Sequence, residues 1–522
     1  MYILEDTFIF KLKSYKDFMA DRLDEYIAKT IRDGDKGSKL LAAICAPTLN
    51  NPRVDIVNSG MNGTAVLRPQ VGEIIVVHSN GGDPAIPDLK KYTASMVEKL
   101  VSDSFRIGAK PLGFGNIVDA SSMDLDMISA IGQSLKESAD RHHLPVMNGE
   151  LADLGKRVNC QANVSGTMIS IIPKNHPSVI ANSGRGIFEY EGVTYAIFNP
   201  KGKAIFINCD GIGTKTEFYE RIMENNRQLI ERALKESLDV QLPFGLEDFI
   251  AMNADDTGKL AAELQVLSGV LETKGNIPSR LMKEKLRKIT SEFGVLGILQ
   301  EEFVGNRIRG YNDFSMSYNI SGSAVSTIDE ERLRNLPKPQ EGDYLVAIRG
   351  ISNPRSNGIT AKRKIMEKLF GPDWHETPEG KIFLEYLATP STILYPTFNA
   401  LFQRKVATSV FHNSGGAYDG KLARPLAKHG LFVDLGDRLF QPDWREVTLA
   451  AYSLSTRDSY VKWPMGTDGF VSTFAPQTAK ETIRERGLEA EVVGRLEKAV
   501  EGRTGVQLKA FNGEEIYFSG RD

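Results

Sequence analysis

The sequence predicts an α+β protein with two similar N-terminal units followed by one C-terminal unit. The first observation behind this prediction is a repeat, because Asn163-Val-Ser-Gly-Thr-Met-Ile-Ser170 returns as Asn319-Ile-Ser-Gly-Ser-Ala-Val-Ser326. The second is that strand-like and helical patterns alternate along the chain, which argues against a helical bundle. The third is length, because 522 residues are enough for about three or four domains of ordinary size.

A second pair of matching segments supports the repeat. Asn58-Ser-Gly60 precedes the apolar strand Glu73–His78, and Asn182-Ser-Gly184 precedes the apolar strand Ala204–Asn208. Chance resemblance between short strands is the alternative. Two anchors in the same order favour a duplicated domain.

Apolar spacing and turn residues place the remaining elements. We expect helices over residues 92–107 and 251–267 in the two repeats, and a linker at the charged, Pro-rich segment 333–342. The expected C-terminal elements are strand 344–349, helix 361–370, helix 389–405, strand 469–474, helix 478–486 and strand 491–494. The expected domains are a helical N-terminal arm (1–50), a first repeat (51–175), a second repeat (176–332) and a C-terminal domain (333–522).

Composition narrows the class of protein. Apolar residues make up 41% and charged residues 25% of the chain, as in a soluble globular protein. The net charge of −3 gives no basic excess for nucleic acid or a membrane surface. The three cysteines lie far apart, which argues against a zinc site or a disulfide framework. With no signal peptide and no long apolar run, we expect a cytoplasmic enzyme.

One glycine-rich motif has the chemistry of a polyphosphate site. Cys209-Asp-Gly-Ile-Gly-Thr-Lys215 directly follows an apolar strand. Its glycines let the backbone approach an anion closely, while Thr214 offers a hydroxyl and Lys215 a compact positive charge. The spacing is neither that of a P-loop nor that of a dinucleotide fingerprint. A glycine-rich turn with a surface lysine is the alternative interpretation.

A second motif has the chemistry of a Mg²⁺ site. Met252-Asn-Ala-Asp-Asp256 clusters oxygen-bearing side chains at the expected entrance of a helix. Magnesium usually takes one or two carboxylates together with substrate phosphates. An N-terminal cap with acidic residues that complement the helix dipole explains the same pattern.

Three further motifs follow strands. Glu150, in Asn148-Gly-Glu150, would emerge just past a strand end. Arg355-Ser-Asn-Gly358 lies between an expected strand and helix, where backbone N–H groups bind phosphate well. His412-Asn-Ser-Gly-Gly416 follows an apolar strand. A solvated acid, a capped turn and a structural histidine are the respective alternatives.

In their order, these motifs resemble the AIR synthetase superfamily, and within it the cyclo-ligases. The C-terminal motifs carry the most specific resemblance: Gly342–Arg349 followed by Arg355–Gly358 is similar to the family's GD…G…SNG, Leu387–Tyr395 to its LLTPTRIYV and Phe411–Gly416 to its HITGGG. The segments Met465-Gly-Thr-Asp-Gly-Phe470 and Glu491-Val-Val-Gly494 are similar to its final motifs. The resemblance covers about residues 55–495.

This chain departs from the family in one instructive way. The family has one N-terminal domain per chain and pairs two chains so that their sheets form a barrel, whereas this chain carries the domain twice. The second copy keeps Asp210-Gly-Ile-Gly-Thr-Lys215, and the first copy keeps Asn148-Gly-Glu150. The resemblance therefore implies an internal pseudo-dimer in which Ile74–Val77 and Ile205–Ile207 share one β-barrel, plus one C-terminal α+β domain. A monomer of this kind and a homodimer both remain open.

The resemblance implies an activity in purine biosynthesis: ATP-dependent closure of the imidazole ring of formylglycinamidine ribonucleotide, with ATP and Mg²⁺ bound. The implied site residues are Lys215, Asp210 and His412 for catalysis; Gly211, Gly213, Thr214, Lys215 and Asn253 for ATP; Asp210, Asp255 and Asp256 for metal; and Glu150, Ser356, Asn357, Gly358, Gly415 and Gly416 for the phosphoribosyl substrate. The alternatives are a relative with another acceptor, such as a small-molecule kinase or an amide-activating enzyme, and a non-catalytic nucleotide-binding paralogue.

Overall fold

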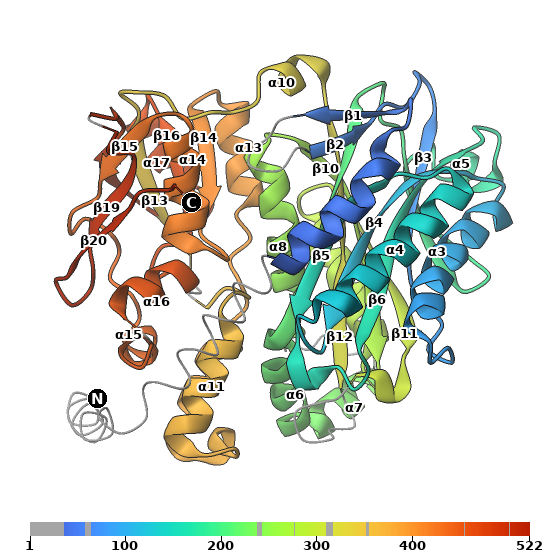
Figure 1. Cartoon of the computed structure of the whole chain (residues 1–522), viewed down its shortest axis with the longest axis horizontal. Coiled ribbons are helices and arrows are strands. Elements are labelled where there is room, and N and C mark those ends of the chain that lie inside the picture. The colour runs from blue at the N-terminus through green and yellow to red at the C-terminus, as the bar shows by residue number, and fades with distance from the viewer. Residues whose placement is uncertain are drawn as a thin grey trace. The chain divides into compact units, whose positions relative to one another are not determined.

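The computed structural model describes residues 36–57, 64–236, 243–275, 277–308, 317–350, 354–453, 455–500 and 502–521. The chain divides into two compact units, a larger one formed by Gly34–Leu336 with Ile393–Asn399 and a smaller one that includes Pro337–Thr392 and Ala400–Asp522. Both contain sheets and helices, so the predicted α+β class is confirmed (Figure 1). The predicted motif Asn58–Gly60 and residues 1–35 of the predicted arm lie outside the described residues.

Two six-stranded sheets of the larger unit repeat one strand order. One sheet runs β7-β8-β3-β6-β4-β5 and the other β1-β2-β9-β12-β10-β11. In both, the pair β4–β5 or β10–β11 is parallel and its neighbours are antiparallel. The shared strands are β3 (Ile74–Gly81), β4 (Lys110–Ala120), β5 (Val146–Asp153) and β6 (Ala162–Ile172), matched by β9 (Ala204–Gly211), β10 (Glu263–Thr273), β11 (Leu296–Phe303) and β12 (Tyr318–Ile328). This is the arrangement that a duplicated domain requires.

The edge hairpin of each sheet comes from the other repeat. The strands β1 (Val54–Val57) and β2 (Thr64–Leu67) precede β3 in the chain, yet β2 pairs with β9. Likewise β7 (Gly186–Tyr190) and β8 (Val193–Phe198) precede β9, yet β8 pairs with β3. Each repeat therefore completes the sheet of the other, which ties the two together through backbone hydrogen bonds.

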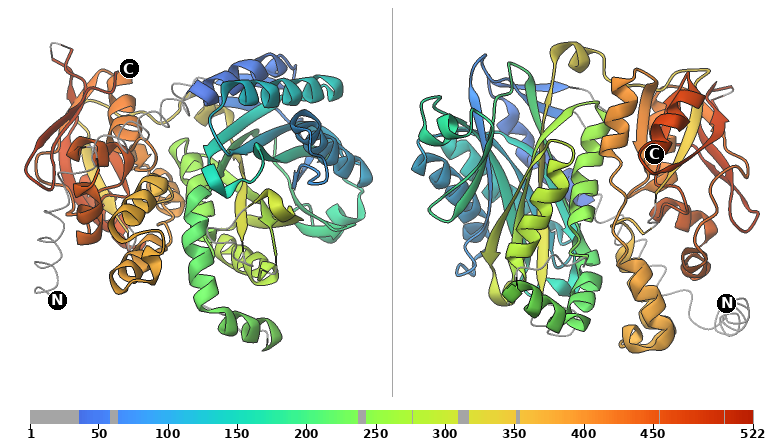
Figure 2. Two further views of the ribbon diagram at one scale, coloured as in Figure 1. Left: turned by 60° about the horizontal axis from the view of Figure 1, so that its bottom comes forward. Right: turned by 180° about the vertical axis from the view of Figure 1, so that it is seen from behind.

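Helices cover the outer faces of these sheets. α3 (Leu89–Arg106) and α4 (Leu125–His142) lie side by side on the first sheet (Figures 1 and 2). α8 (Leu246–Lys259) packs on β9, β10 and β12, and α9 (Ser279–Ser291) packs on β11. The helix predicted over 92–107 is confirmed. The one predicted over 251–267 is wrong beyond Lys259, because its second half starts β10, and an apolar run alone does not separate the two structures.

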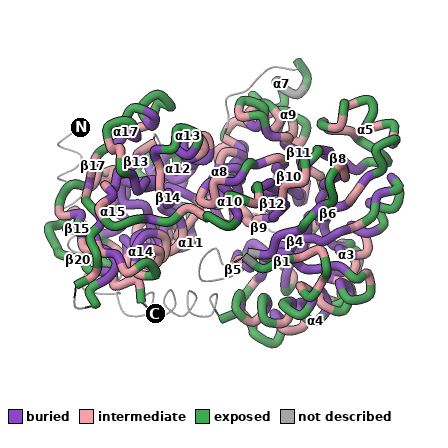
Figure 3. The backbone as a smooth tube through the Cα atoms, turned by 90° about the horizontal axis from the view of Figure 1, so that it is seen from above, coloured by how far each residue is buried: buried purple, intermediate pink, exposed green. Residues whose placement is uncertain are grey.

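The inner faces of the two sheets bury one common apolar core. Along β3, Ile75 and Val77 point into this core together with Ile205 and Ile207 of β9. All four are at most 1% exposed. The intervening residues of β3 pack on the opposite face instead, as the two-residue period of a strand dictates. Figure 3 shows the central strands buried along their length, whereas α4 is buried on one face, with Ile131 and Leu135, and exposed on the other.

The repeated motif NxSG lies where the two sheets meet. The Ser165 and Ser321 hydroxyls of the two copies are hydrogen-bonded at 2.8 Å. A Cβ on Gly322 would lie 2.3 Å from the Ser268 carbonyl oxygen, and one on Gly166 would lie 2.9 Å from that of Gly115. Only glycine fits at these positions, which gives the sequence repeat a packing reason.

The described end of the predicted N-terminal arm packs on the first sheet's helices. Residues 36–45 are helical. Leu41 and Cys45 are buried in one cluster with Ile131 of α4. The larger unit also holds the short helices α5 (Pro177–Ala181), α6 (Thr216–Asn225), α7 (Arg227–Glu236) and α10 (Glu330–Arg334).

The smaller unit has two four-stranded sheets, ordered β14-β16-β13-β17 and β18-β15-β19-β20. Their bounds are β13 (Tyr344–Arg349), β14 (Ala407–His412), β15 (Leu431–Asp434), β16 (Gly469–Thr473), β17 (Glu489–Arg495), β18 (Glu497–Lys498), β19 (Gly505–Lys509) and β20 (Glu515–Phe518). The helices here are α11 (Ile359–Phe370), α12 (Pro378–Leu387), α14 (Arg424–Lys428), α15 (Trp444–Ala451), α16 (Thr456–Lys462) and α17 (Pro476–Arg484), while α13 (Tyr395–Gln403) joins the two units in sequence.

Most expected elements of this unit are confirmed within a few residues. The exception is the helix predicted from residue 389, because α13 starts at Tyr395. Pro390 disfavours helical geometry at the residue before it, which explains the later start. Across the described part of the chain, none of the helices combines the length and apolar character needed to cross a membrane.

Candidate functional site

The glycine-rich motif forms a strand, a tight turn and a helix in succession. Asp210 and Gly211 end β9, residues Gly213–Lys215 form a single 3₁₀ turn, and α6 follows at once. Gly213 has φ +56°, a backbone conformation that favours glycine. A turn of this kind brings backbone N–H groups together at a helix start, where an anion is stabilised.

The Lys215 side chain is buried, so the interpretation of a turn with a surface lysine is wrong. Both Lys215 and Asp248 are 0% exposed, and the Lys215 Nζ donates to Asp248 Oδ1 at 2.8 Å. The Tyr219 hydroxyl donates to the other oxygen of the same carboxylate. Burial, followed by the Asp248 charge, holds the pKa of the Tyr219 phenol well above its usual range. This ion pair fastens the turn to α8.

The Asn/Asp motif lies in the second half of α8 and not at a helix entrance, because the helix begins at Leu246. The N-terminal-cap interpretation is therefore wrong. The Asn253 Nδ2 donates to the Asp210 carbonyl at 3.2 Å, which connects the helix to the end of β9. The Asp255 Oδ1 accepts backbone N–H groups of Leu394 and Tyr395, each at 2.8 Å. Asp255 thus holds the segment 393–399, and its predicted role as a metal ligand stays a prediction.

Comparison of the two repeats shows which residue of α8 corresponds to Asp103 of α3. Asp103 pairs with Arg106, and Asp256 pairs with Lys259, in both cases three residues apart on the covering helix. One residue after each aspartate, Ser104 bonds to Ser170 at 2.9 Å and Thr257 bonds to Ser326 at 3.2 Å. Asp256 is therefore the counterpart of Asp103.

In the first repeat, Asp103 accepts a hydrogen bond from the Asn80 side chain at 2.7 Å. Asn80 is the next-to-last residue of β3, as Asp210 is of β9. The second repeat consequently places a carboxylate, Asp210, where the first has an amide that donates to the helix carboxylate. A carboxylate at this place would repel a facing carboxylate unless a cation or a proton lay between them, and Lys259 is the cation that the structure pairs with Asp256.

The first repeat covers the turn of the second. A Cβ on Gly213 would lie 3.4 Å from the Leu154 side chain, and one on Gly115 would lie 2.4 Å from the Cys209 sulfur. Burial raises the pKa of the Cys209 thiol to about 12, and the charges of Glu150 and Asp210 act in the same direction. Glu150 lies inside β5, so the prediction that it follows the strand end is wrong. Its side chain nevertheless belongs to the region around Cys209 and Asp210.

A metal at this turn would need ligands beyond the protein. Within the described residues, no group of three His, Cys, Asp or Glu side chains is placed to hold a metal ion. The prediction that Asp210, Asp255 and Asp256 hold a metal therefore stays a prediction.

The C-terminal motifs converge in the smaller unit. Gly358, with φ +68°, caps α11, and a Cβ there would lie 2.4 Å from the Trp463 indole nitrogen. A Cβ on Gly415 would lie 3.0 Å from the Asn357 amide nitrogen. The structure therefore brings the Ser356–Gly358 turn against Gly415 and Gly416, two segments far apart in the sequence.

Two buried charged groups beside these motifs were missed by sequence reasoning. Asp468 accepts the Gly350 N–H at 2.6 Å, and Arg355, which is 1% exposed, lowers its pKa. Burial prevails and raises the pKa of Asp468 to about 6. His412 ends β14 beside them and is 3% exposed. The signal was in the sequence, since Asp468 stands within a family-like motif.

The backbone after Gly416 is strained. Ala417 has φ +36°, a region that L-residues rarely adopt, directly after Gly416 at φ +82°. The cyclo-ligase motif has a third glycine at this point, so the alanine is a departure of this chain. Strain of this kind persists where the surrounding structure fixes the backbone, often next to a binding site.

Comparison with known proteins identifies the first repeat. Residues 62–172 match the family model of the AIR synthase related protein, N-terminal domain. These residues are similar to that N-terminal domain. The predicted resemblance to the AIR synthetase superfamily is thereby confirmed.

The chain is similar to curated phosphoribosylformylglycinamidine cyclo-ligases. The one from Clostridium perfringens is 26% identical over 192 residues, which are 37% of this chain and 56% of that relative. The one from Anaeromyxobacter sp. strain K is 24% identical over 333 residues, 62% of this chain and 88% of that relative. The match to the first of these thus spans little more than half of its length.

The chain is less similar in sequence to the solved structures than to these two relatives. T. maritima PurL complexed with FGAR is 12% identical with a TM-score of 0.37, over 64% of this chain and 47% of that one. Thiamine-monophosphate kinase from Stenotrophomonas maltophilia is 11% identical with a TM-score of 0.36, over 63% of this chain and 92% of that one.

Proposed function

We propose that this protein is an ATP-dependent phosphoryl-transfer enzyme that closes the imidazole ring of formylglycinamidine ribonucleotide, yielding 5-aminoimidazole ribonucleotide, ADP and phosphate. One observation carries the proposal: the turn from β9 through Gly213 to α6 is tied to Asn253 of α8 through the Asp210 carbonyl and is covered by Leu154 of the other repeat. Backbone N–H groups, a hydroxyl and nearby carboxylates are what a Mg²⁺-bound polyphosphate needs.

The ATP phosphates would lie on Gly211, Gly213 and the Thr214 hydroxyl. We give Lys215 a supporting role, because its ammonium is already paired with Asp248 inside the protein. A phosphate that competed for this lysine would leave Asp248 buried without its counter-charge, which is strongly unfavourable.

We place Mg²⁺ on Asp210 and Asp256 rather than on Asp255, with the ion competing with Lys259 for the Asp256 carboxylate. Asp210 and Asp256 occupy the places of Asn80 and Asp103, which are in direct contact in the first repeat. The ion would supply charge neutralisation for the transferred phosphoryl group. Asp255 is engaged by two backbone N–H groups instead.

This reaction requires the protein to position ATP and the substrate, and it requires no nucleophilic side chain. The γ-phosphoryl group passes from ATP to the formamide oxygen of the substrate, which becomes a leaving group; the ring-forming amine attacks the same carbon, and phosphate departs. Within the smaller unit, we propose Ser356, Asn357 and Gly358 at the start of α11 as phosphate-binding residues, with Gly415 against Asn357 and Gly416 next in the chain. Glu150 and His412 stay candidates for contacts with the reacting groups.

We further propose that the two repeats form an internal pseudo-dimer with a shared β-barrel, and that one chain is sufficient for activity. The common core of both sheets and the exchanged hairpins support this. An intrachain pair has an effective concentration of about the millimolar range, so no partner chain is needed to complete the site.

The test is an ADP-release assay with purified protein, ATP, Mg²⁺ and one candidate acceptor at a time. Release that requires formylglycinamidine ribonucleotide, with formation of the aminoimidazole product, supports the proposal. Asp210→Asn should abolish it, whereas Asp55→Asn, a matched change on the remote β1 edge, should not. Release with another acceptor only, such as thiamine monophosphate, would assign a different member of the superfamily. No release with any acceptor, despite ATP binding, would favour a non-catalytic paralogue.

A further inference from the structure

A cavity lies at the end of β3, where the first repeat has its counterpart of the β9 turn. It has a volume of about 780 Å³ and is built from the end of β3, the exposed side of α3, the β7–β8 turn and β11. That volume is in the range of small-molecule sites. The function proposed above makes no use of this cavity, and the inference does not depend on it.

The lining of this cavity is unsuited to polyphosphate. The β3 strand ends in Asn80-Gly-Gly-Asp83, and α3 begins only at Leu89, so no helix start follows the glycines directly. Five carboxylates line the cavity against three cationic side chains; the carboxylates are those of Asp83, Glu98, Asp103, Glu191 and Glu302. Glu98 is paired with Arg141 at 2.6 Å and with His142 at 2.9 Å outside the lining, so the other four carboxylates and the three cations leave a formal charge of −1. An anionic ligand would be repelled here.

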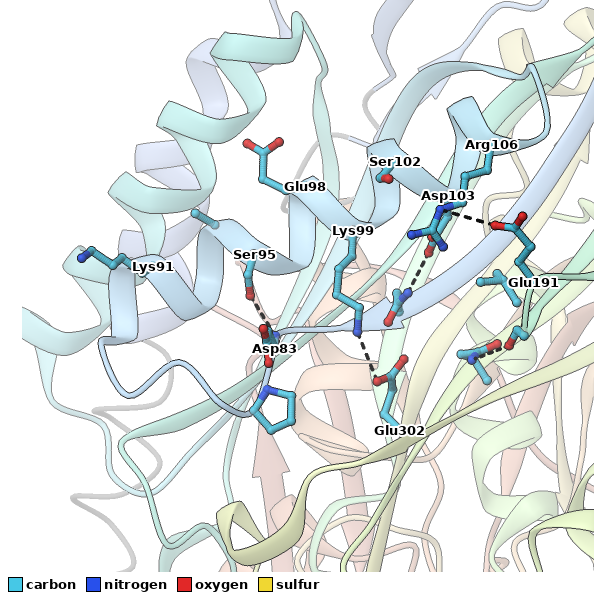
Figure 4. A pocket seen from close by; sticks show the side chains of 16 residues that line it. Asp83, Lys91, Ser95, Glu98, Lys99, Ser102, Asp103, Arg106, Glu191 and Glu302 are labelled. Atoms are coloured by element: carbon cyan, nitrogen blue, oxygen red, sulfur yellow. Dashed lines mark hydrogen bonds and ion pairs between the residues drawn. The ribbon is translucent and has the colours of Figure 1, made fainter.

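Carboxylates already bind two of the three cations. Lys99 of α3 points across to β11 and pairs with Glu302 at 3.2 Å, as Figure 4 shows. Arg106 pairs with Asp103 at 3.1 Å and lies 3.9 Å from Glu191. Lys91 lies at the far end of α3 and is exposed. Lys99 and Arg106 are thus already paired with carboxylates of the protein.

The negative charge converges on the cavity floor. Asp103 is 3% exposed and takes hydrogen bonds from Asn80 and Arg106. Burial raises the pKa of Glu302, and the nearby Asp103 and Asp83 raise it further against the opposing effect of Lys99. An added cation next to Glu302 would relieve this repulsion between like charges.

We propose that this cavity binds a small organic cation with at least two protonated amino groups, such as a di- or polyamine. One ammonium group lies between Glu302 and Asp83, and the chain carries the other toward Glu191. Charged hydrogen bonds from ammonium to carboxylate are stronger than neutral ones. Surroundings with a lower dielectric constant than water strengthen them further. The apolar methylene chain suits the parts of the wall made by Pro84, Ala94 and Val193.

Calorimetric titration of the full chain with spermidine tests the proposal. We expect saturable binding of one spermidine per chain in low salt, weakened about tenfold or more by Glu302→Gln. Glu301→Gln is the matched control, because it removes the same charge one residue away, where Glu301 pairs with Lys283 at 3.6 Å and does not line the cavity. Asp83→Asn, at an exposed position, should weaken binding without a risk to folding.

Four results would overturn the inference, and the first three concern amine binding itself. They are absence of saturable binding to the unmodified chain, equal weakening by Glu302→Gln and Glu301→Gln, and binding of butylamine as tight as that of 1,4-diaminobutane. Displacement of spermidine by ATP would also contradict it, since it would assign the cavity to a nucleotide. Persistence of spermidine binding in an Asp210→Asn variant would show that this site is separate from the ATP site.

Discussion

Replacement of Lys215 by methionine should destabilise the larger unit by about 3–5 kcal/mol. The side chains of Lys215 and Asp248 are both 0% exposed, with 2.8 Å between Nζ and Oδ1. Removing one member of a buried pair leaves the other charge in a medium of low polarity, which accounts for a loss of this size. Methionine retains most of the length of the lysine stem, so lost packing contributes little.

The assay can separate the two units, because the three tryptophans, Trp374, Trp444 and Trp463, all belong to the smaller one. Urea unfolding followed by far-UV circular dichroism reports on the whole chain, and tryptophan fluorescence reports on the smaller unit. Lys215→Met should shift the dichroism transition and leave the fluorescence transition in place.

The matched control is Lys285→Met. Lys285 pairs with Glu247 at 3.0 Å, but each side chain is 22% exposed, so its removal should cost at most about 1 kcal/mol. The double variant Lys215→Met/Asp248→Leu should recover much of the loss, because both partners of the pair are then apolar. A Lys215→Met chain that unfolds at the same urea concentration as the unmodified chain would refute the reasoning.

Three further predictions follow from single contacts. Burial and then Asp119 raise the pKa of Glu272 to about 8, and Asn319 donates to both carboxylates at 2.7 and 3.1 Å. Because the pKa of this acid is higher in the folded state than in the unfolded chain, the free energy of unfolding falls as pH rises from the ordinary pKa through about 8. Glu272→Gln should make this fall smaller when the free energy of unfolding is measured between about pH 5 and about pH 9. An unchanged slope would contradict the prediction. Asp256→Asn should weaken Mg-ATP binding about tenfold or more in calorimetry. Asp255→Ala removes the acceptor of two buried N–H groups and should instead lower the free energy of unfolding by about 2–3 kcal/mol. The reverse pattern would assign the metal to Asp255. Ala417→Gly should raise the stability of the smaller unit by about 1 kcal/mol, read from tryptophan fluorescence, because glycine tolerates φ +36°; a loss would mean that the alanine methyl group packs favourably.

The parts of the fold that depend on local pattern could be predicted from the sequence. The apolar runs at β3, β9 and β13 have no competing interpretation, and the NxSG repeat marks a real contact between the two sheets. The boundary between α8 and β10 was missed, because both segments are apolar at helical spacing and no turn residue separates them. The exchange of the edge hairpins could not be predicted from the sequence, because the pairing of Leu67 with Ile205 depends on packing between distant segments.

The candidate site was predictable only in its residue types. Asp210 and Gly213 stand at a strand end and a turn, as the motif indicates. The burial of Lys215 against Asp248 could not be predicted from the sequence, because the two residues are 33 positions apart and their contact depends on tertiary packing. The distinction between Asp255 and Asp256 likewise depends on the segment around Leu394, which lies far along the chain.

Calorimetric titration of the purified chain with ATP in the presence of Mg²⁺ tests the central claim most directly. A composite site with Asp210 and Asp256 from the second repeat and its cover from the first predicts one Mg-ATP per chain, in a protein that light scattering shows to be monomeric. Asp210→Asn should remove this binding, and Asp83→Asn, at the matching end of β3, should leave it unchanged. Two ATP per chain, binding that is equally strong without Mg²⁺, or binding that appears only in a dimer would contradict the account.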